Sequence, residues 1–139
     1  MKIYFSGSIS GGREYLDYYI KIGAILKSFG HEILTEHILD PGLSAQGENN
    51  DAVSIFNRDI EMLKESDIII AEISTPSHGV GYEIAIGVEI GKPILCLLND
   101  NLKNHRISAM IEGNAPDKLI IKRYNDNNLK EIIEDYLKK

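Results

Sequence analysis

The sequence predicts one α/β domain in which a parallel five-stranded sheet carries helices on both faces. Short apolar runs alternate with longer amphipathic stretches, the 139 residues suit one compact domain, and no repeat, low-complexity tract or linker divides the chain. Strands that alternate with helices pair in parallel, and their crossovers are right-handed. We therefore expect residues 1–139 to form a doubly wound sandwich of the Rossmann-like or flavodoxin-like kind.

The expected elements follow from local patterns along the chain. The first strand, KIYFSG at 2–7, is a buried apolar run that glycine stops, and the stretch at 13–29 has apolar residues near helical spacing closed by Gly30. The remaining expectations are the strand HEILTE at 31–36, a long loop at 37–50, a helix at about 51–65, the strand DIIIAEI at 67–73, a helix after the loop STPSHG, the strand PILCLLND at 93–100, the strand LIIKRY at 119–124 and a terminal amphipathic helix NLKEIIEDYLKK.

The composition excludes several classes of partner. A formal charge of −6 without a basic stripe argues against a general affinity for nucleic acid, although one small anion needs only local donors. No segment approaches 18 apolar residues, and the apolar run at the N-terminus is too short for a signal peptide. We therefore expect a cytoplasmic protein that does not bind membranes.

Neither the cysteine nor the histidines form a metal-binding pattern. Cys96 is the only cysteine and lies in the apolar run PILCLL, so we expect a buried core thiol and no disulfide within the chain. The histidines show neither HxH nor HxxxH spacing. We expect no metal site.

Ligands of doubly wound sheets bind beyond the carboxyl ends of the strands, near the point where the strand order reverses. This rule selects the loops that follow the first three strands, which are GSISGGR, TEHILDPG and STPSHGVGYE.

The first of these loops, GSISGGR at 7–13, is glycine-rich and leads into a helix. Its backbone amides and the hydroxyls of Ser8 and Ser10 could hold an anion at the helix N-terminus, or the loop could be a tight turn with a helix cap. It matches neither GxGxxG nor GxxxxGK[ST], which disfavours dinucleotide binding and nucleoside triphosphate hydrolysis. Arg13 either assists an anion or is simply solvated.

The third loop, SHGVGYE at 77–83, has the same arrangement. Ser77 suits a helix cap or an anion-binding hydroxyl, and Gly79 and Gly81 allow a ligand to approach the backbone. Glu83 is expected to project from the first helical turn toward that ligand. The alternative is that Glu83 only stabilises the helix dipole.

A second carboxylate and a phenol add to this picture. In FNRDIEML, Phe56, Ile60 and Leu63 form an apolar helical stripe with Asp59 beside it, which is unusual because carboxylates are seldom buried without a partner. Two carboxylates near one concave site suggest glycosyl chemistry. Tyr4, near the end of the first strand, could hydrogen-bond a carboxylate or pack in the core.

With these residues assembled, the chain resembles the 2′-deoxynucleoside 5′-monophosphate N-glycosidases, which are relatives of the nucleoside 2-deoxyribosyltransferases. The matching pieces run in order across most of the chain, and they are YFSGSISGGRE (4–14), LTEH (34–37), RDIEML and SDIIIAE (58–72), PSHGVGYE (76–83), KPILCL (92–97) and RISAMIEG (106–113).

The resemblance implies roles for individual residues. Glu83 corresponds to the nucleophile, Asp59 to its partner in handling the leaving group and water, and Tyr4 to the phenol that orients the nucleophile. Ser8, Ser77 and Ser108 match 5′-phosphate binders, and Gly7, Ile9, Gly11 and Gly12 match positions that line the phosphate loop. Ser108 in that family reaches the neighbouring subunit's site, which implies a homodimer.

One position departs from the family pattern. Ser10 stands where mammalian relatives carry arginine, so either the affinity for phosphate is weaker here or Arg13 compensates.

The implied reaction is hydrolysis of the N-glycosidic bond of a 2′-deoxynucleoside 5′-monophosphate through a Glu83 glycosyl-enzyme ester, without a metal or organic cofactor. Three alternatives remain: a nucleoside 2-deoxyribosyltransferase, a ribonucleoside 5′-monophosphate N-glycosidase of the CMP type, and a non-enzymatic nucleotide-binding module. The resemblance does not identify the base or say whether the nucleotide is modified. We also expect the loop at 37–50 to close over the base.

Overall fold

The computed structural model describes residues 1–102, 104, 106–114 and 119–139. Its sheet has the order β2-β1-β3-β4-β5, and every neighbouring pair of strands is parallel. The strands are β1 (Lys2–Ser6), β2 (Glu32–Ile33), β3 (Ile68–Glu72), β4 (Ile94–Asn99) and β5 (Leu119–Tyr124). This sheet confirms the predicted fold class.

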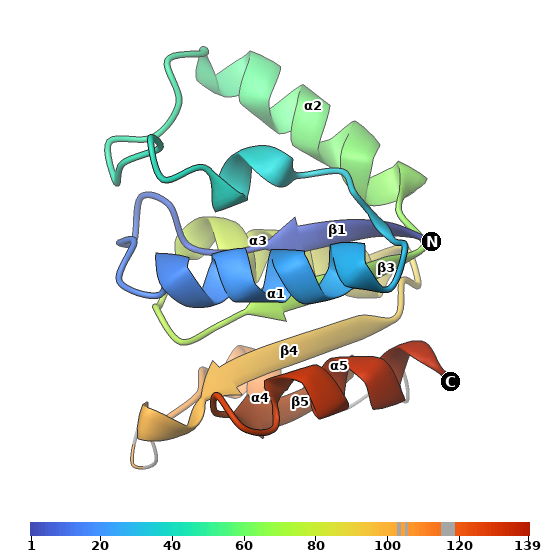
Figure 1. The fold of residues 1–139 in the computed structure, drawn as a ribbon. Coiled ribbons are helices and arrows are strands. Elements are labelled where there is room, and N and C mark those ends of the chain that lie inside the picture. Colours follow the sequence, from blue (N-terminus) through green and yellow to red (C-terminus); the bar gives the residue numbers. More distant parts are fainter. Residues whose placement is uncertain (103, 105, 115–118) are drawn as a thin grey trace.

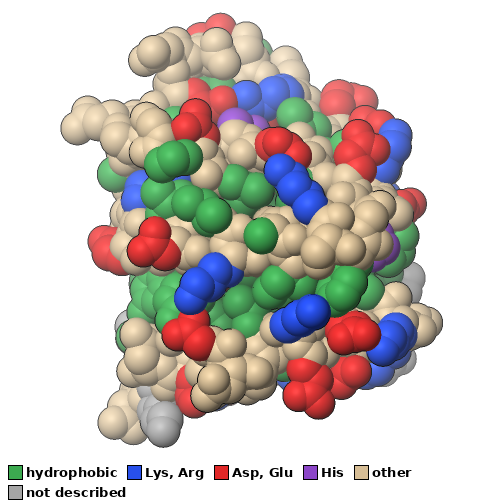
Figure 2. Space-filling model, viewed as in Figure 1, with side chains coloured by type: hydrophobic (Ala, Val, Ile, Leu, Met, Phe, Trp, Pro, Cys, Tyr) green, Lys and Arg blue, Asp and Glu red, His purple; other side chains and the backbone are tan. Residues whose placement is uncertain are grey.

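Helices cover both faces of the sheet (Figure 1). They are α1 (Leu16–Ser28), α2 (Ala52–Glu65), α3 (His78–Glu89), α4 (Ala109–Glu112) and α5 (Leu129–Leu137), with the short 3₁₀ helices η1 (Glu36–Leu39) and η2 (Asp100–Leu102). Figure 2, drawn from the same side, shows hydrophobic side chains gathered between α1 and α5 with acidic and basic side chains interspersed around them.

The alternation of side chains along the strands divides the core into two layers. Ile3 and Phe5 of β1 pack with Tyr19 of α1, together with apolar residues of α5. Tyr4 faces the other way and packs with Leu63 of α2 and with residues of α3. The face that carries α2 and α3 is therefore the face toward which Tyr4 points.

The strand order reverses between β1 and β3, which lie side by side although β2 and α2 separate them in the sequence. Their register pairs Ser6 with Ala71, so both strands end at the same edge. This edge is where the fold places a ligand.

The strand expected at 31–36 was too long. Only Glu32 and Ile33 form β2, and the chain then turns into η1. The Thr35 hydroxyl accepts a hydrogen bond from the Phe5 N–H at 3.0 Å and donates one to the Phe5 carbonyl at 2.6 Å. A side chain thus takes the place of the main-chain pairing that would have continued the strand.

The expected apolar stripe of α2 holds only in part. Leu63 is fully buried, whereas Phe56 is 48% exposed and meets the exposed Tyr82 ring edge-on with a centroid separation of 6.3 Å. The beginning of α2 therefore stands away from the sheet, and its aromatic residue packs against α3 instead of entering the core.

Candidate active site

Tyr4, Ser6 and Glu83 converge at the switch point of the sheet. Tyr4 and Ser6 are two residues apart on β1, so their side chains leave the same face. Tyr4 is 2% exposed and Ser6 is 1% exposed. The Ser6 hydroxyl donates to Glu83 Oε2 at 2.5 Å, and the Tyr4 hydroxyl also hydrogen-bonds the Glu83 carboxylate. Two hydroxyls thus fix the orientation of one carboxylate.

The electrostatics of Glu83 keep its carboxylate poised for proton exchange or attack. Burial raises its pKa to about 7 and the negative charge of Asp59 adds to this effect, while the hydrogen bonds from Ser6 and Tyr4 oppose it. Burial, together with the Glu83 and Asp59 charges, also raises the pKa of Tyr4, so its phenol stays protonated. A perturbed carboxylate with two fixed donors is typical of a catalytic group.

The expectation that Glu83 lies in the first helical turn was wrong. Ser77 is the N-cap of α3, whose first residue is His78, so Glu83 is the sixth residue of the helix. The dipole effect falls off within the first turn. Stabilisation of the helix N-terminus therefore does not explain Glu83.

Asp59, on α2, lies close enough to Glu83 for its charge to act on the Glu83 carboxylate. Its charge acts on both Glu83 and Tyr4, so the structure brings the three predicted catalytic residues together. Asp59 Oδ1 accepts hydrogen bonds from Arg58 Nε at 2.9 Å and forms an ion pair with Arg58 Nη2 at 2.8 Å. The guanidinium compensates the carboxylate at the edge of the core.

Two residues of this site were missed from the sequence. Ser6 was treated only as part of the first strand, although its spacing of two from Tyr4 was a usable signal. Arg58 carried no comparable signal, because its partner Glu48 lies in the irregular loop before α2.

The loop at 7–13 contains an unpartnered hydroxyl. Ser8 is fully buried, and within the described residues its Oγ has no hydrogen-bond partner, while its N–H donates to the Tyr19 hydroxyl at 3.0 Å. A buried polar group without a partner calls for a ligand or water. The Ser8 hydroxyl therefore has hydrogen-bonding capacity that the chain itself does not use.

Glycine is required at two positions of this loop. A Cβ on Gly11 would lie 2.5 Å from the Pro76 carbonyl oxygen and 2.8 Å from Ser8 Oγ, and Gly12 has a φ of +127°. Gly11 therefore lets the loop at 7–13 approach the loop before α3.

The other predicted members of this loop have different surroundings. The partly buried Ile9 packs against the core on the α1 side, and a Cβ on Gly7 would lie 3.0 Å from the Tyr19 ring. Ser10 is exposed, and its hydroxyl lies 3.9 Å from the position of a Cβ on Gly47. Gly47 belongs to the loop predicted to cover the site.

Arg13 joins two loops. Its Nη2 donates to the carbonyls of Ile38 at 2.8 Å and Asp40 at 3.0 Å, and its Nη1 donates to the Ser8 carbonyl at 3.4 Å. The guanidinium also lies over the Tyr19 ring. Arg13 therefore connects the end of η1 and the residue that follows it to the loop at 7–13.

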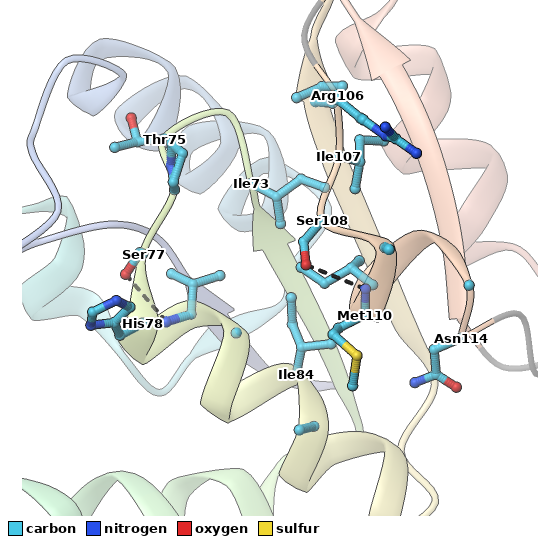
Figure 3. Close-up of a pocket in the computed structure, with 18 of the residues that line it drawn as sticks. Ile73, Thr75, Ser77, His78, Ile84, Arg106, Ile107, Ser108, Met110 and Asn114 are labelled. Carbon is cyan, nitrogen blue, oxygen red and sulfur yellow. Dashed lines mark hydrogen bonds between the residues drawn. The ribbon is translucent and has the colours of Figure 1, made fainter.

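Ser77 and Ser108 line a cavity of about 840 Å³ beside α3 (Figure 3). Each hydroxyl accepts a hydrogen bond at 3.3 Å from a backbone N–H, that of Val80 or Met110 respectively. Tyr4, Asp59 and Glu83 are not among the lining residues. Ser77 and Ser108 therefore line one mainly apolar cavity, and Glu83 does not line it.

Gly79 and Gly81 are not crowded by their surroundings. A Cβ on Gly79 would meet only Ser77 Oγ at 3.9 Å, and one on Gly81 would meet nothing within 4 Å. Gly81 lines the cavity. These glycines leave room for a ligand or a second chain, and the fold itself does not require them.

Within the described part of the chain, no group of three or more His, Cys, Asp or Glu residues could hold a metal ion. No helix there is long and apolar enough to cross a membrane.

Comparisons with known proteins identify the family of this chain. Residues 3–125 match the family model of the nucleoside 2-deoxyribosyltransferases. The 5-hydroxymethyl-dUMP N-hydrolase of Esox lucius is 41% identical over 144 residues, covering 99% of this chain and 97% of that one. The enzyme of the same name from Danio rerio is 40% identical over 138 residues, covering 98% of this chain and 95% of that one.

Two solved structures share the fold. A 2-deoxyribosyltransferase of Bacillus psychrosaccharolyticus superposes with a TM-score of 0.69 at 22% identity, covering 98% of this chain and 92% of that one. A CMP N-glycosidase of Clostridium botulinum superposes with a TM-score of 0.67 at 16% identity, covering 98% and 99%. Together with the family match over most of the chain, these findings show that the chain belongs to the nucleoside 2-deoxyribosyltransferase family.

Proposed function

We propose that this protein hydrolyses the N-glycosidic bond of 2′-deoxynucleoside 5′-monophosphates to a free base and 2-deoxyribose 5-phosphate. The observation that carries the proposal is the Glu83 carboxylate, held by Tyr4 and Ser6 beside Asp59. The fish relatives, named for hydrolysis of 5-hydroxymethyl-dUMP, act on a nucleotide of this class.

Glu83 attacks C1′ of the sugar while the bond between C1′ and the base breaks, and the base leaves with the electron pair of that bond. Tyr4 and Ser6 keep the attacking oxygen aligned. Water then attacks C1′ and the ester breaks. Asp59 passes a proton to the departing base and regains one from the water. Over the cycle, the hydroxyl of water goes to C1′ and its proton to the base, so both carboxyl groups end as they began.

The 5′-phosphate is assigned to the loop at 7–13 and the start of α3. Support comes from the unpartnered Ser8 hydroxyl, the close approach of the loop to Pro76 that Gly11 allows, and Ser77 at the N-terminus of α3. Arg13 supports this site through the loop that it fastens. The hydrogen bonds of Arg13 thus hold the phosphate loop in a chain that has Ser10 where mammalian relatives carry arginine.

The assembly is proposed to be a homodimer in which Ser108 serves the neighbouring site. Met110 lines the cavity and is 84% exposed, and on α3 and at its end Tyr82 and Ile90 are 59% and 41% exposed. Such side chains are favourable to bury against a second chain. Ser108 lines a cavity that does not include Glu83, which is consistent with a role in a partner's site.

The substrate class is tested by following base release from 5-hydroxymethyl-dUMP, dGMP, deoxyguanosine and GMP by chromatography. Release is expected from the two deoxynucleotides only, because the phosphate loop and the Tyr4 phenol select for phosphate and against a 2′-hydroxyl. Cleavage of GMP would instead identify a ribonucleotide glycosidase. Release from deoxyguanosine only when an acceptor base is present would identify a transferase, and no release at all would favour a binding module.

Mixing two inactive variants tests the shared site. If Ser108 acts across the dimer, subunit exchange between Glu83→Gln and Ser108→Ala gives heterodimers with one fully native site, and activity rises well above either parent. If Ser108 acts within its own chain, no native site forms and activity does not rise. The matched control mixes the double variant with the native protein, which forms no additional native sites under the trans arrangement.

A further inference from the structure

Arg58 connects the catalytic carboxylate beside it to a distant loop. Its Nε and Nη2 both contact Asp59 Oδ1, at 2.9 and 2.8 Å. Its Nη1 and Nη2 donate to the two oxygens of Glu48, at 2.6 and 2.8 Å, in the bidentate geometry of the strongest carboxylate pairs. Since both contacts with Asp59 end on Oδ1, the fork leaves Oδ2 available to substrate or water.

This cluster differs from an ordinary surface ion pair. The side chains of Arg58, Asp59 and Glu48 are 29%, 20% and 14% exposed, whereas the residues around Glu48 in the loop are largely exposed. Exposed pairs contribute little, but removing one partner of a largely desolvated pair leaves an uncompensated charge. Loss of Arg58 would leave Glu48 and Asp59 facing each other as two carboxylates.

His37 completes the cluster. Its Nε2 lies 3.2 Å from Arg58 Nη2, which can only donate, so the histidine accepts through a neutral ring. Burial lowers the pKa of His37, and the Arg58 charge lowers it further. The three groups that meet Arg58 therefore come from η1, the following loop and α2.

The same loop is fastened at its other end by Arg13, which binds the carbonyls of Ile38 and Asp40. Between the two arginines, Gly47 approaches the Ser10 hydroxyl of the phosphate loop. The segment 38–48 thus runs from the phosphate loop to the catalytic carboxylate, and an arginine holds each end.

We propose that Arg58 is a positioning residue that fixes Asp59 and, through Glu48, holds the segment 38–48 beside the active site. Closure of this loop and alignment of Asp59 are then a single event, because one guanidinium makes both sets of bonds. The proposal rests on the proposed function for its catalytic part only. The fastening of the loop stands on contacts within the chain.

Steady-state kinetics of base release from dGMP distinguish the contact of Arg58 with Glu48 from its contact with Asp59. Glu48→Gln, which loosens only the loop, is expected to raise KM about tenfold with kcat nearly unchanged. Arg58→Gln is expected to raise KM similarly and to lower kcat about tenfold to a hundredfold, since Asp59 is misplaced as well. The double variant should match Arg58→Gln, because Glu48 acts only through Arg58.

Amide hydrogen exchange of residues 42–50 gives a readout that does not depend on activity. Exchange should be faster in Glu48→Gln and Arg58→Gln than in the native protein. Lys64→Gln is the matched control, since Lys64 lies on the same helix in an exposed pair with Glu61. It should change neither kinetics nor exchange.

Additive effects of the two substitutions, or an unchanged kcat and KM in Arg58→Gln, would overturn the positioning role. Unchanged exchange in both variants would overturn the fastening of the loop. If the native protein released no base from any nucleotide, the proposed function would fail, and exchange would still decide whether Arg58 holds the loop.

Discussion

Glu83→Gln is expected to lower base release from dGMP by at least about a thousandfold, because an amide cannot form the ester through which the sugar is transferred. The substitution keeps the shape of the side chain, and its carbonyl oxygen can still accept the Ser6 hydrogen bond. The measurement is chromatographic base release, combined with mass spectrometry of acid-quenched enzyme. An adduct of deoxyribose phosphate on Glu83 should form in the native protein and be absent in the variant.

Glu89→Gln provides the matched control, since Glu89 lies on the same helix and is exposed. It should leave the rate unchanged. A loss of less than about tenfold in Glu83→Gln would mean that Glu83 is not the nucleophile, because removal of a nucleophile costs far more than removal of an accessory group.

Asp59→Asn is expected to lower kcat by about 10² to 10⁴, the usual contribution of a group that transfers protons. It should also move the acidic limb of the pH profile. Glu83 must be ionised to attack, so activity falls as pH drops through its pKa of about 7. Burial is the main cause of that raised pKa and remains in the variant, but the Asp59 charge is removed. The pKa of Glu83 therefore falls, and the residual activity extends to lower pH.

The measurement is kcat/KM against pH for the native protein and the variant, with Glu61→Gln on the exposed face of the same helix as control. A limb that stayed in place, or moved to higher pH, would contradict the coupling between the two carboxylates. Glu72 is a second group that could produce this limb, because burial raises its pKa to about 7 as well. Glu72 accepts hydrogen bonds from Ser74 and Tyr124 and not from the residues around Glu83. Glu72→Gln should therefore leave the acidic limb unchanged.

The sequence predicted the layers of the fold because apolar alternation and glycine positions are local signals. The bounds of elements depended on contacts that are not local. Thr35 ended β2 early because its hydroxyl pairs with Phe5 across the sheet, and Phe56 left the core because Tyr82 offered it a partner on α3. Neither contact could be inferred from spacing along the chain.

The candidate site also combines residues that local patterns indicate with residues that depend on contacts between separate parts of the chain. Asp59 was singled out because a carboxylate beside an apolar helical stripe is unusual, whereas the roles of Tyr4 and Glu83 came from the family resemblance, and the structure brings the three together. Arg58 was missed because the role proposed for it depends on Glu48. Glu48 lies ten residues earlier in the chain, and the loop before α2 folds back so that the two side chains meet. Ser108 was predicted from resemblance alone, and its place beside Ser77 depends on the path of the chain after β4.

The single cysteine gives this protein a practical advantage for optical work on the loop. Cys96 is fully buried in β4, and burial raises the pKa of its thiol to about 12, so thiol-reactive dyes should not label it in the folded protein. A cysteine introduced by Ser44→Cys would lie at an exposed position of the loop and would be the one reactive thiol in the chain. Fluorescence from a dye at that position would then test in real time whether the loop opens and closes, in a protein that otherwise keeps its native sequence.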